Sequence, residues 1–111
     1  MNYLAVRLAP GERWRYVPPA EHDVLWIAVG KGSVMTPDRV RHGELAIFAP
    51  DQATVEFVAE DDTEFMLGSA VPHPHDLVLG YYSVHTTAEA LAKGEQCIRE
   101  IRAELVRQGR L

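Results

Sequence analysis

The sequence has almost no cysteine, since Cys97 is the single one among 111 residues. One thiol excludes an internal disulfide and a cysteine-rich zinc site, and it favours a reducing, cytoplasmic location. The sequence also lacks any apolar run near the roughly 18 residues needed to cross a bilayer. Its first residues, Met1-Asn2-Tyr3-Leu4, lack the basic start and apolar stretch of a signal peptide. We therefore expect no membrane segment.

Positive charge is also scarce, because 11 basic side chains stand against 16 acidic ones and give a net charge of −5. A surface that binds the nucleic-acid backbone needs an excess of Lys and Arg, so this balance argues against a nucleic-acid partner. The imbalance lies in residues 1–70, with six basic and eleven acidic groups, whereas residues 71–111 hold five of each. We therefore divide the chain into residues 1–70 and 71–111. Both parts belong to one domain, because a chain of this length leaves little room for a second core.

Residues 1–70 have the pattern of short strands separated by turns. Leu4, Val6 and Leu8 recur at every second position, which is the period of a half-buried strand. Residues 23–29 carry apolar side chains on both faces, which predicts a strand covered on both sides. About seven or eight such segments recur at a spacing of roughly 8–12 residues, with no helical pattern between them. The pattern predicts an all-β fold, either a small barrel or a sandwich.

Residues 71–111 end in a predicted helix. Thr86-Thr87-Ala88-Glu89 fits a capping box, in which a threonine oxygen accepts a free N–H and Glu89 reaches back. Gly94 lies inside the helical pattern, where it either breaks the helix in two or allows a close backbone contact. The apolar positions form a narrow stripe at helical spacing. We call this stripe the assembly helix face, and it consists of Leu91, Ile98, Ile101 and Leu105.

Four segments are more specific than this general pattern. They are Val6-Arg7-Leu8-Ala9-Pro10-Gly11-Glu12-Arg13, His22-Asp23 with the strand and glycine turn from Trp26 to Val34, Gly43-Glu44-Leu45-Ala46, and the stretch from Leu79 to Thr86. In this order they resemble the C-terminal cupin domain of the pirin family. The resemblance implies a small cupin-type β-barrel, jelly-roll-like and antiparallel, over residues 1–70. An exit segment and a C-terminal α-helix follow over residues 71–111, packing on the barrel or on a partner. By this resemblance we expect the domain to stand alone, without the metal-binding N-terminal cupin of a full pirin.

The metal ligands that cupins use are missing from the corresponding positions. Laid over Gly11 to Gly30, the first cupin motif places Val17, Pro19 and Asp23 at ligand positions, and the second motif places Val55 near its histidine. One carboxylate remains where three imidazoles and a carboxylate are needed. We therefore expect no metal and no other cofactor at the usual cupin site. In pirins the metal and the dioxygenase-like chemistry belong to the other domain.

The histidines leave two enzymatic alternatives open. His22 and Asp23 at a strand start form either an acid–base pair, working with Tyr16 in a metal-free isomerase or lyase, or a turn that satisfies backbone groups. His73, His75 and Asp76 form either a metal site displaced from the barrel, as in a dioxygenase-like cupin, or a polar loop.

The aromatic residues leave a further choice open. Trp14, Tyr16 and Trp26 either line a ligand pocket, together with His22 and Asp23, or belong to the core. Cys97 we interpret as a small buried residue.

The resemblance, together with the missing metal ligands, implies a metal-free, single-domain cupin similar to the pirin C-terminal domain, which acts as an assembly or small-molecule-binding module. In a pirin the second cupin covers the C-terminal helix and one sheet face, so here these apolar surfaces need another cover. We expect a homodimer with the helices packed in cis or exchanged. A separately encoded pirin-like N-terminal cupin is the alternative partner, and a small-molecule ligand is a further one.

Overall fold

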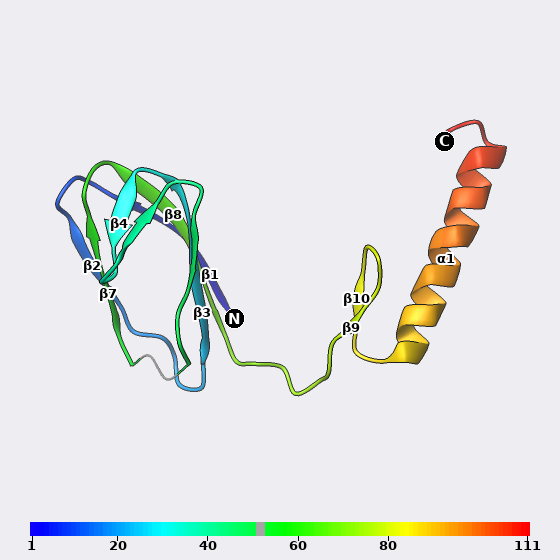
Figure 1. Ribbon diagram of the computed structural model, residues 1–111, viewed down its shortest axis with the longest axis horizontal. Helices are drawn as coiled ribbons and strands as arrows, with labels where there is room; N and C mark the ends of the chain where they lie inside the picture. Colours follow the sequence, from blue (N-terminus) through cyan, green and yellow to red (C-terminus); the bar gives the residue numbers. More distant parts are fainter. Residues whose placement is uncertain (51–52) are drawn as a thin grey trace. The chain divides into compact units, whose positions relative to one another are not determined.

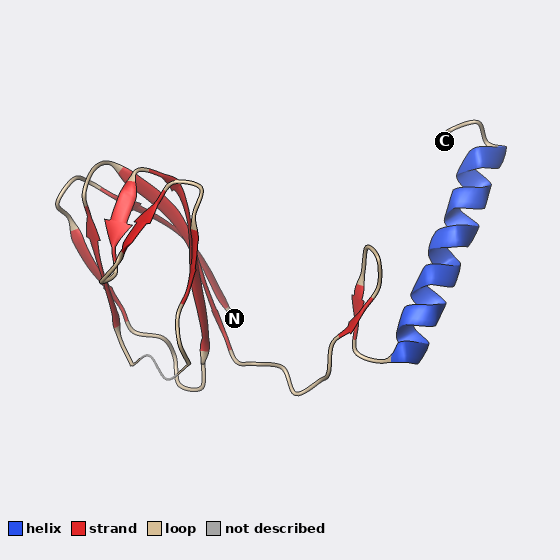
Figure 2. Cartoon of the chain, in the orientation of Figure 1, coloured by secondary structure: helices blue, strands red, loops and turns tan. Residues whose placement is uncertain are grey.

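The computed structural model describes residues 1–50 and 53–111, and the chain divides into two compact units, residues 1–72 and 73–111 (Figure 1). The first unit contains the strands β1 to β8, and the second contains a short hairpin and a helix (Figure 2). No helix in the described ranges is long and apolar enough to span a membrane.

The first unit is built from two four-stranded antiparallel sheets. Sheet A has the order β1-β8-β3-β6, and sheet B has the order β2-β7-β4-β5. The strands of sheet A are β1 (Asn2–Leu8), β8 (Thr63–Ala70), β3 (Val24–Lys31) and β6 (Leu45–Ile47). The strands of sheet B are β2 (Arg13–Tyr16), β7 (Val55–Ala59), β4 (Ser33–Met35) and β5 (Arg39–Arg41). The strand pattern of residues 1–70 therefore indicated the correct class of fold.

The core lies between the two sheets and is filled by side chains of alternate strand positions. Phe57 is at its centre and fully buried, and its ring stacks on Trp14 at 5.5 Å and lies 5.1 Å from Phe65. Phe48 meets Phe57 edge to face. Such aromatic pairs stabilise a core beyond the area that they bury. Because these rings fill the space between the sheets, the interior is a packed core at this level.

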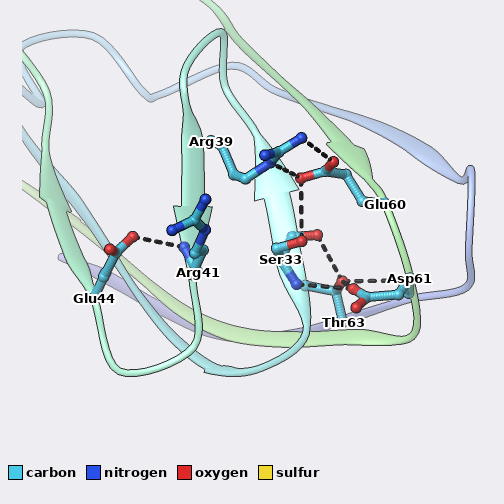
Figure 3. A network of polar contacts seen from close by, with 7 residues as sticks. All are labelled: Ser33, Arg39, Arg41, Glu44, Glu60, Asp61 and Thr63. Atoms are coloured by element: carbon cyan, nitrogen blue, oxygen red, sulfur yellow. Dashed lines mark hydrogen bonds and ion pairs between the residues drawn. The ribbon is translucent and has the colours of Figure 1, made fainter.

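Polar side chains tie the turn between β3 and β4 to the turn before β8. Gly32 has φ +73, a conformation that glycine adopts without strain. A side chain there would also collide with Asp61, whose carboxylate accepts the N–H of Ser33 at 2.8 Å. The buried Thr63 hydroxyl donates to the Ser33 carbonyl at 3.0 Å (Figure 3). These contacts set the register at this end of the sandwich.

The second unit consists of a hairpin of β9 (Val78–Leu79) and β10 (Val84–His85) and the helix α1 (Ala88–Arg107). Thr87 is the N-cap, and its hydroxyl accepts the Ala90 N–H at 3.1 Å. The helix thus starts one residue too late for the predicted capping box, and Glu89 occupies the second helical position. No contact back from Glu89 to the cap occurs in the described structure.

Gly94 is the contact point between helix and hairpin. The helix passes through Gly94 without a break. A Cβ built there would lie 2.8 Å from the His85 ring, so the glycine makes room for this imidazole. Leu91 packs in the same way over Gly80 of the hairpin. Of the two predicted roles for Gly94, the close contact is confirmed.

Candidate functional site

Four polar side chains meet at the end of the sandwich where β2 and β8 end and β1 begins. The Asn2 amide donates to the Tyr16 hydroxyl at 2.9 Å, and the Tyr16 hydroxyl lies 2.8 Å from the Ser69 hydroxyl. The Ser69 hydroxyl lies 2.9 Å from Nδ1 of His22. Tyr16 belongs to sheet B and Ser69 to sheet A, so this polar string bridges the two sheets.

The amide of Asn2 favours one direction for the hydrogen bonds of the polar string. Asn2 donates to Tyr16, so the acceptor within reach for the buried Tyr16 O–H is Ser69. The Ser69 O–H then donates to Nδ1 of His22. In this direction of the string a neutral His22 carries its proton on Nε2. The ring is half-buried, and within the described ranges Nε2 has no hydrogen-bond partner.

Asp23 does not join this string. Its side chain is exposed, and its backbone N–H donates to the Glu21 carbonyl at 2.9 Å. The structure therefore brings two of the three candidate acid–base residues together, Tyr16 and His22, and it does so through Ser69. Sequence reasoning missed Ser69. The signal was available, because Ser69 continues the inward phase of Phe65 and Leu67.

The five pocket candidates do not line one cavity. Trp14 lies inside the sandwich against Phe57, whereas Trp26 lies on the outer face of sheet A over Gly68, where an added Cβ would collide with its indole. Their shared phase in the sequence is misleading because β2 and β3 belong to different sheets. Cys97 is exposed on α1, so our interpretation of it as a buried residue is wrong.

His73 and His75 do not form a metal-binding cluster within the described residues. The His73 and His75 rings stack with centroids 6.1 Å apart, and Nδ1 of His73 accepts the His75 N–H at 3.2 Å. Over the described ranges no group of three or more His, Cys, Asp or Glu side chains has metal-binding geometry. At the usual cupin positions Val17 is exposed, Pro19 lies in a loop and Val55 is buried in β7. Neither set therefore offers three donors to one ion.

The outer face of sheet A is apolar across all four strands. The strand register aligns Tyr3, Gly68, Trp26 and Ile47 in one row and Ala5, Met66, Ala28 and Leu45 in the next. We call these two rows the apolar rows. Ile47 is 77% exposed, and a surface groove of about 670 Å³ runs beside Ala5, Ala28 and Met66. A water-facing antiparallel sheet is expected to carry polar residues on this side.

A charged row closes this surface at one edge. Arg7 pairs with Glu64 at 2.8 Å, and Lys31 pairs with Asp62 at 2.8 Å. The hydrogen bond and the positive charge of Lys31 lower the pKa of the Asp62 carboxyl, and the same hydrogen bond and the negative charge of Asp62 raise the pKa of Lys31. Because these pairs are exposed to solvent, they contribute little to the stability of the fold. They mark the edge of the apolar rows.

The assembly helix face is only partly covered within its own unit. Leu91 packs on the hairpin at Gly80, and Leu105 is half-buried. Ile98 is 52% exposed and Ile101 is 59% exposed. Of the residues described in α1, none is fully buried.

The comparisons with known proteins place the fold. No protein-family model matches the chain, and no curated protein matches it. Among solved structures, the crystal structure of quercetin 2,3-dioxygenase from Acinetobacter baumannii, a cupin-fold protein, is similar with a TM-score of 0.77 and 20% sequence identity. The similarity covers 89% of this chain and 35% of that chain, so this chain spans about a third of its length.

At this level of identity the similarity establishes a small cupin-type β-fold with a C-terminal helix, as the sequence predicted. The closer assignment to the pirin C-terminal domain stays a prediction.

Proposed function

We propose that this chain is an assembly module of cupin fold that works without a metal and forms a homodimer. The observation that carries the proposal is the outer face of sheet A. Its apolar rows cross all four strands, and no element of residues 1–50 or 53–72 covers them. The opposite face of the sandwich differs, because sheet B presents Arg13, Arg39 and Arg41 outward. One face is thus suited to water and the other to a partner.

The area of the apolar rows indicates which surface of the second copy they contact. Four strands at about 4.8 Å and two rows at about 7 Å give a contact of roughly 19 by 14 Å. A stable interface buries about 800 Å² on each side, so two such sheets facing each other fall short. Helix α1, about 30 Å long at 1.5 Å per residue, supplies a second surface. In the proposed dimer α1 of each copy packs on sheet A of the other, and two-fold symmetry buries the contact twice.

The shapes of the two surfaces support this pairing. The groove beside the apolar rows is lined by the small side chains of Ala5 and Ala28, with the Arg7–Glu64 ion pair also in its lining. Ile98 and Ile101 project from α1 at a spacing of three residues, which places them on one helix face. Branched side chains on a helix fit a depression between larger ones.

The test is the molar mass in solution, measured by light scattering after size-exclusion chromatography at tens of micromolar. We expect a dimer for the native chain and monomers for Ile47→Lys and for Ile101→Lys. Val17→Lys is the matched control, because Val17 is 62% exposed and lies outside both surfaces. A monomeric native chain, or loss of the dimer in the control as well, would contradict the proposal.

Mixing the two variants distinguishes exchanged helices from facing sheets. The intact helix of Ile47→Lys fits the intact sheet of Ile101→Lys, so an equimolar mixture should recover dimer with one native contact. A dimer of facing sheets would not recover. Capture of a pirin-like N-terminal cupin by a native chain that is otherwise monomeric would support the alternative partner instead.

A second function, acid–base chemistry at His22, uses the other direction of the polar string, in which Nδ1–H donates to the Ser69 hydroxyl and Nε2 carries the free lone pair. Tyr16 and Ser69 would then orient the imidazole, in place of Asp23. The test is His22→Gln against Asp23→Asn in a substrate screen. Turnover that is lost in the first variant and kept in the second would favour this function over assembly alone.

A further inference from the structure

The outer face of sheet B has a groove of about 630 Å³, on the side of the sandwich opposite the apolar rows. It crosses β2, β7 and β4 and continues to Phe48 and Thr54. Met35, Val58 and Phe48 give it an apolar lining. Pockets for small molecules have this volume and combine apolar walls with a few polar groups. None of its lining residues belongs to the polar string or to the apolar rows.

Arg15 is the cation of this groove, and it is held loosely. Its Nε lies 3.7 Å from the Glu56 carboxylate, and the side chain is 68% exposed. Arg39 on the same sheet face is different, because it donates twice to Glu60 at 2.7 and 2.8 Å (Figure 3). That double contact raises the pKa of Arg39 and lowers the pKa of Glu60. The guanidinium of Arg15 thus keeps its paired donors for another carboxylate, while that of Arg39 is engaged.

Thr36 adds a hydroxyl without a partner. Thr36 is 6% exposed, lines the groove, and its Oγ1 has no hydrogen-bond partner among the residues that the structure describes. Thr63, the other buried threonine of this unit, donates to the Ser33 carbonyl. Buried hydroxyls are normally paired, and an unpaired one lowers stability. Oγ1 is covered in this conformation, so rotation of the Thr36 side chain toward the groove would bring its O–H to a ligand oxygen, which would supply the missing acceptor.

We propose that this groove binds a small monocarboxylate with an apolar body and a keto or hydroxy oxygen. The carboxylate pairs with Arg15, the apolar body lies over Met35, Val58 and Phe48, and the Thr36 hydroxyl donates to the second oxygen. Glu56 beside Arg15 disfavours a second negative charge at that end. This site is independent of the proposed assembly surface, which lies on sheet A.

The test uses 3-benzoylpropionate as the probe and follows backbone amide shifts of the full chain by NMR. We expect saturable shifts at Met35, Phe48 and Val58, and binding weaker by about tenfold in Arg15→Gln, as loss of a charge-assisted contact implies. Arg41→Gln is the matched control, since Arg41 lies on the same sheet face outside the groove. Its affinity should stay within about twofold of native.

Two neutral or simpler probes complete the test. The amide of 3-benzoylpropionate should bind native protein as weakly as the acid binds Arg15→Gln. 4-Phenylbutyrate, which lacks the ketone, should bind the native chain and Thr36→Val equally, whereas 3-benzoylpropionate should bind Thr36→Val more weakly than native. Any one of four results would overturn the proposal. They are shifts that map to sheet A, equal losses in Arg15→Gln and Arg41→Gln, equal binding of acid and amide, and no binding at 10 mM, which is about tenfold above the upper end of the usual KM range.

Discussion

Replacing Ser69 by alanine should destabilise the fold because it interrupts the polar string between the sheets. Ser69 is buried and contacts both the Tyr16 hydroxyl at 2.8 Å and Nδ1 of His22 at 2.9 Å. Alanine removes both hydrogen bonds and leaves the Tyr16 O–H without an acceptor. At about 1 kcal/mol for each bond, with a larger penalty for the stranded hydroxyl, we expect a loss of about 2–3 kcal/mol. Against a total of about 5–15 kcal/mol, that loss is readily measured.

Tyr16→Phe gives the second side of a double-mutant cycle. It removes the bond from Asn2 and the bond to Ser69, while Ser69 keeps its contact with His22, so we expect a loss of about 1–2 kcal/mol. In the double variant both hydroxyls of the Tyr16–Ser69 contact are gone, so no hydroxyl is left without its partner. Its loss should therefore fall short of the sum of the single losses by about 1 kcal/mol.

Urea unfolding followed by tryptophan fluorescence measures these free energies, because Trp14 and Trp26 both lie in the first unit. The control cycle combines Ser69→Ala with Val40→Ala, two buried residues on different sheets that share no contact in the polar string. The control should be additive within about 0.5 kcal/mol. Additivity of the Tyr16 and Ser69 variants to the same limit would refute the coupling between the two sheets that we derive from the string.

Two further predictions concern the charged network and the second unit. Arg39 holds the pKa of Glu60 below its ordinary 4.5, so the stability that this pair contributes is present above that value and is lost as the pH falls through the lowered pKa. Thermal melts from pH 7 to pH 3 should therefore show a steeper acid loss for the native chain than for Glu60→Gln, and parallel curves would contradict this. Gly94→Ala should gain about 1 kcal/mol of helix propensity yet displace the His85 ring, so that hydrogen exchange of the β9–β10 amides becomes faster. Lys93→Ala should leave this exchange unchanged, and an equal effect of both variants would show that the glycine contact is unimportant.

The strands and the helix could be predicted from the sequence because they depend on local periodicity. Leu4, Val6 and Leu8 keep the alternation that places them on the inner side of β1, with Leu8 buried. Residues 23–29 carry apolar side chains on both faces, and β3 indeed has Leu25 and Ile27 in the core and Trp26 on the outer face. The outer cover that this pattern implies is the basis of the proposed dimer.

The site could not be predicted in the same way because it depends on contacts between distant residues. Tyr16 and Ser69 are 53 positions apart and meet only because two different sheets face each other. Alternation assigns a residue to one of two faces, but it does not say which face of each sheet points inward. For that reason Trp14 and Trp26, which look equivalent along the chain, lie on opposite sides of sheet A. Asp23 follows His22 in the chain, yet it is Ser69 that contacts the imidazole.

One irregularity in β3 has a consequence for how the length of this chain can vary. Val29 pairs with Phe65 and Lys31 with Glu64, so Gly30 is an extra residue in a β-bulge. If Gly30 were removed, Lys31 would come directly after the inward-facing Val29, and its side chain would remain on the outer face near Asp62. Loss of Gly30 would restore a regular ladder and exchange no faces, whereas loss of any one residue between Leu25 and Ala28 would turn core residues outward. The bulge is therefore the position in β3 where a one-residue difference between homologues is compatible with an unchanged core.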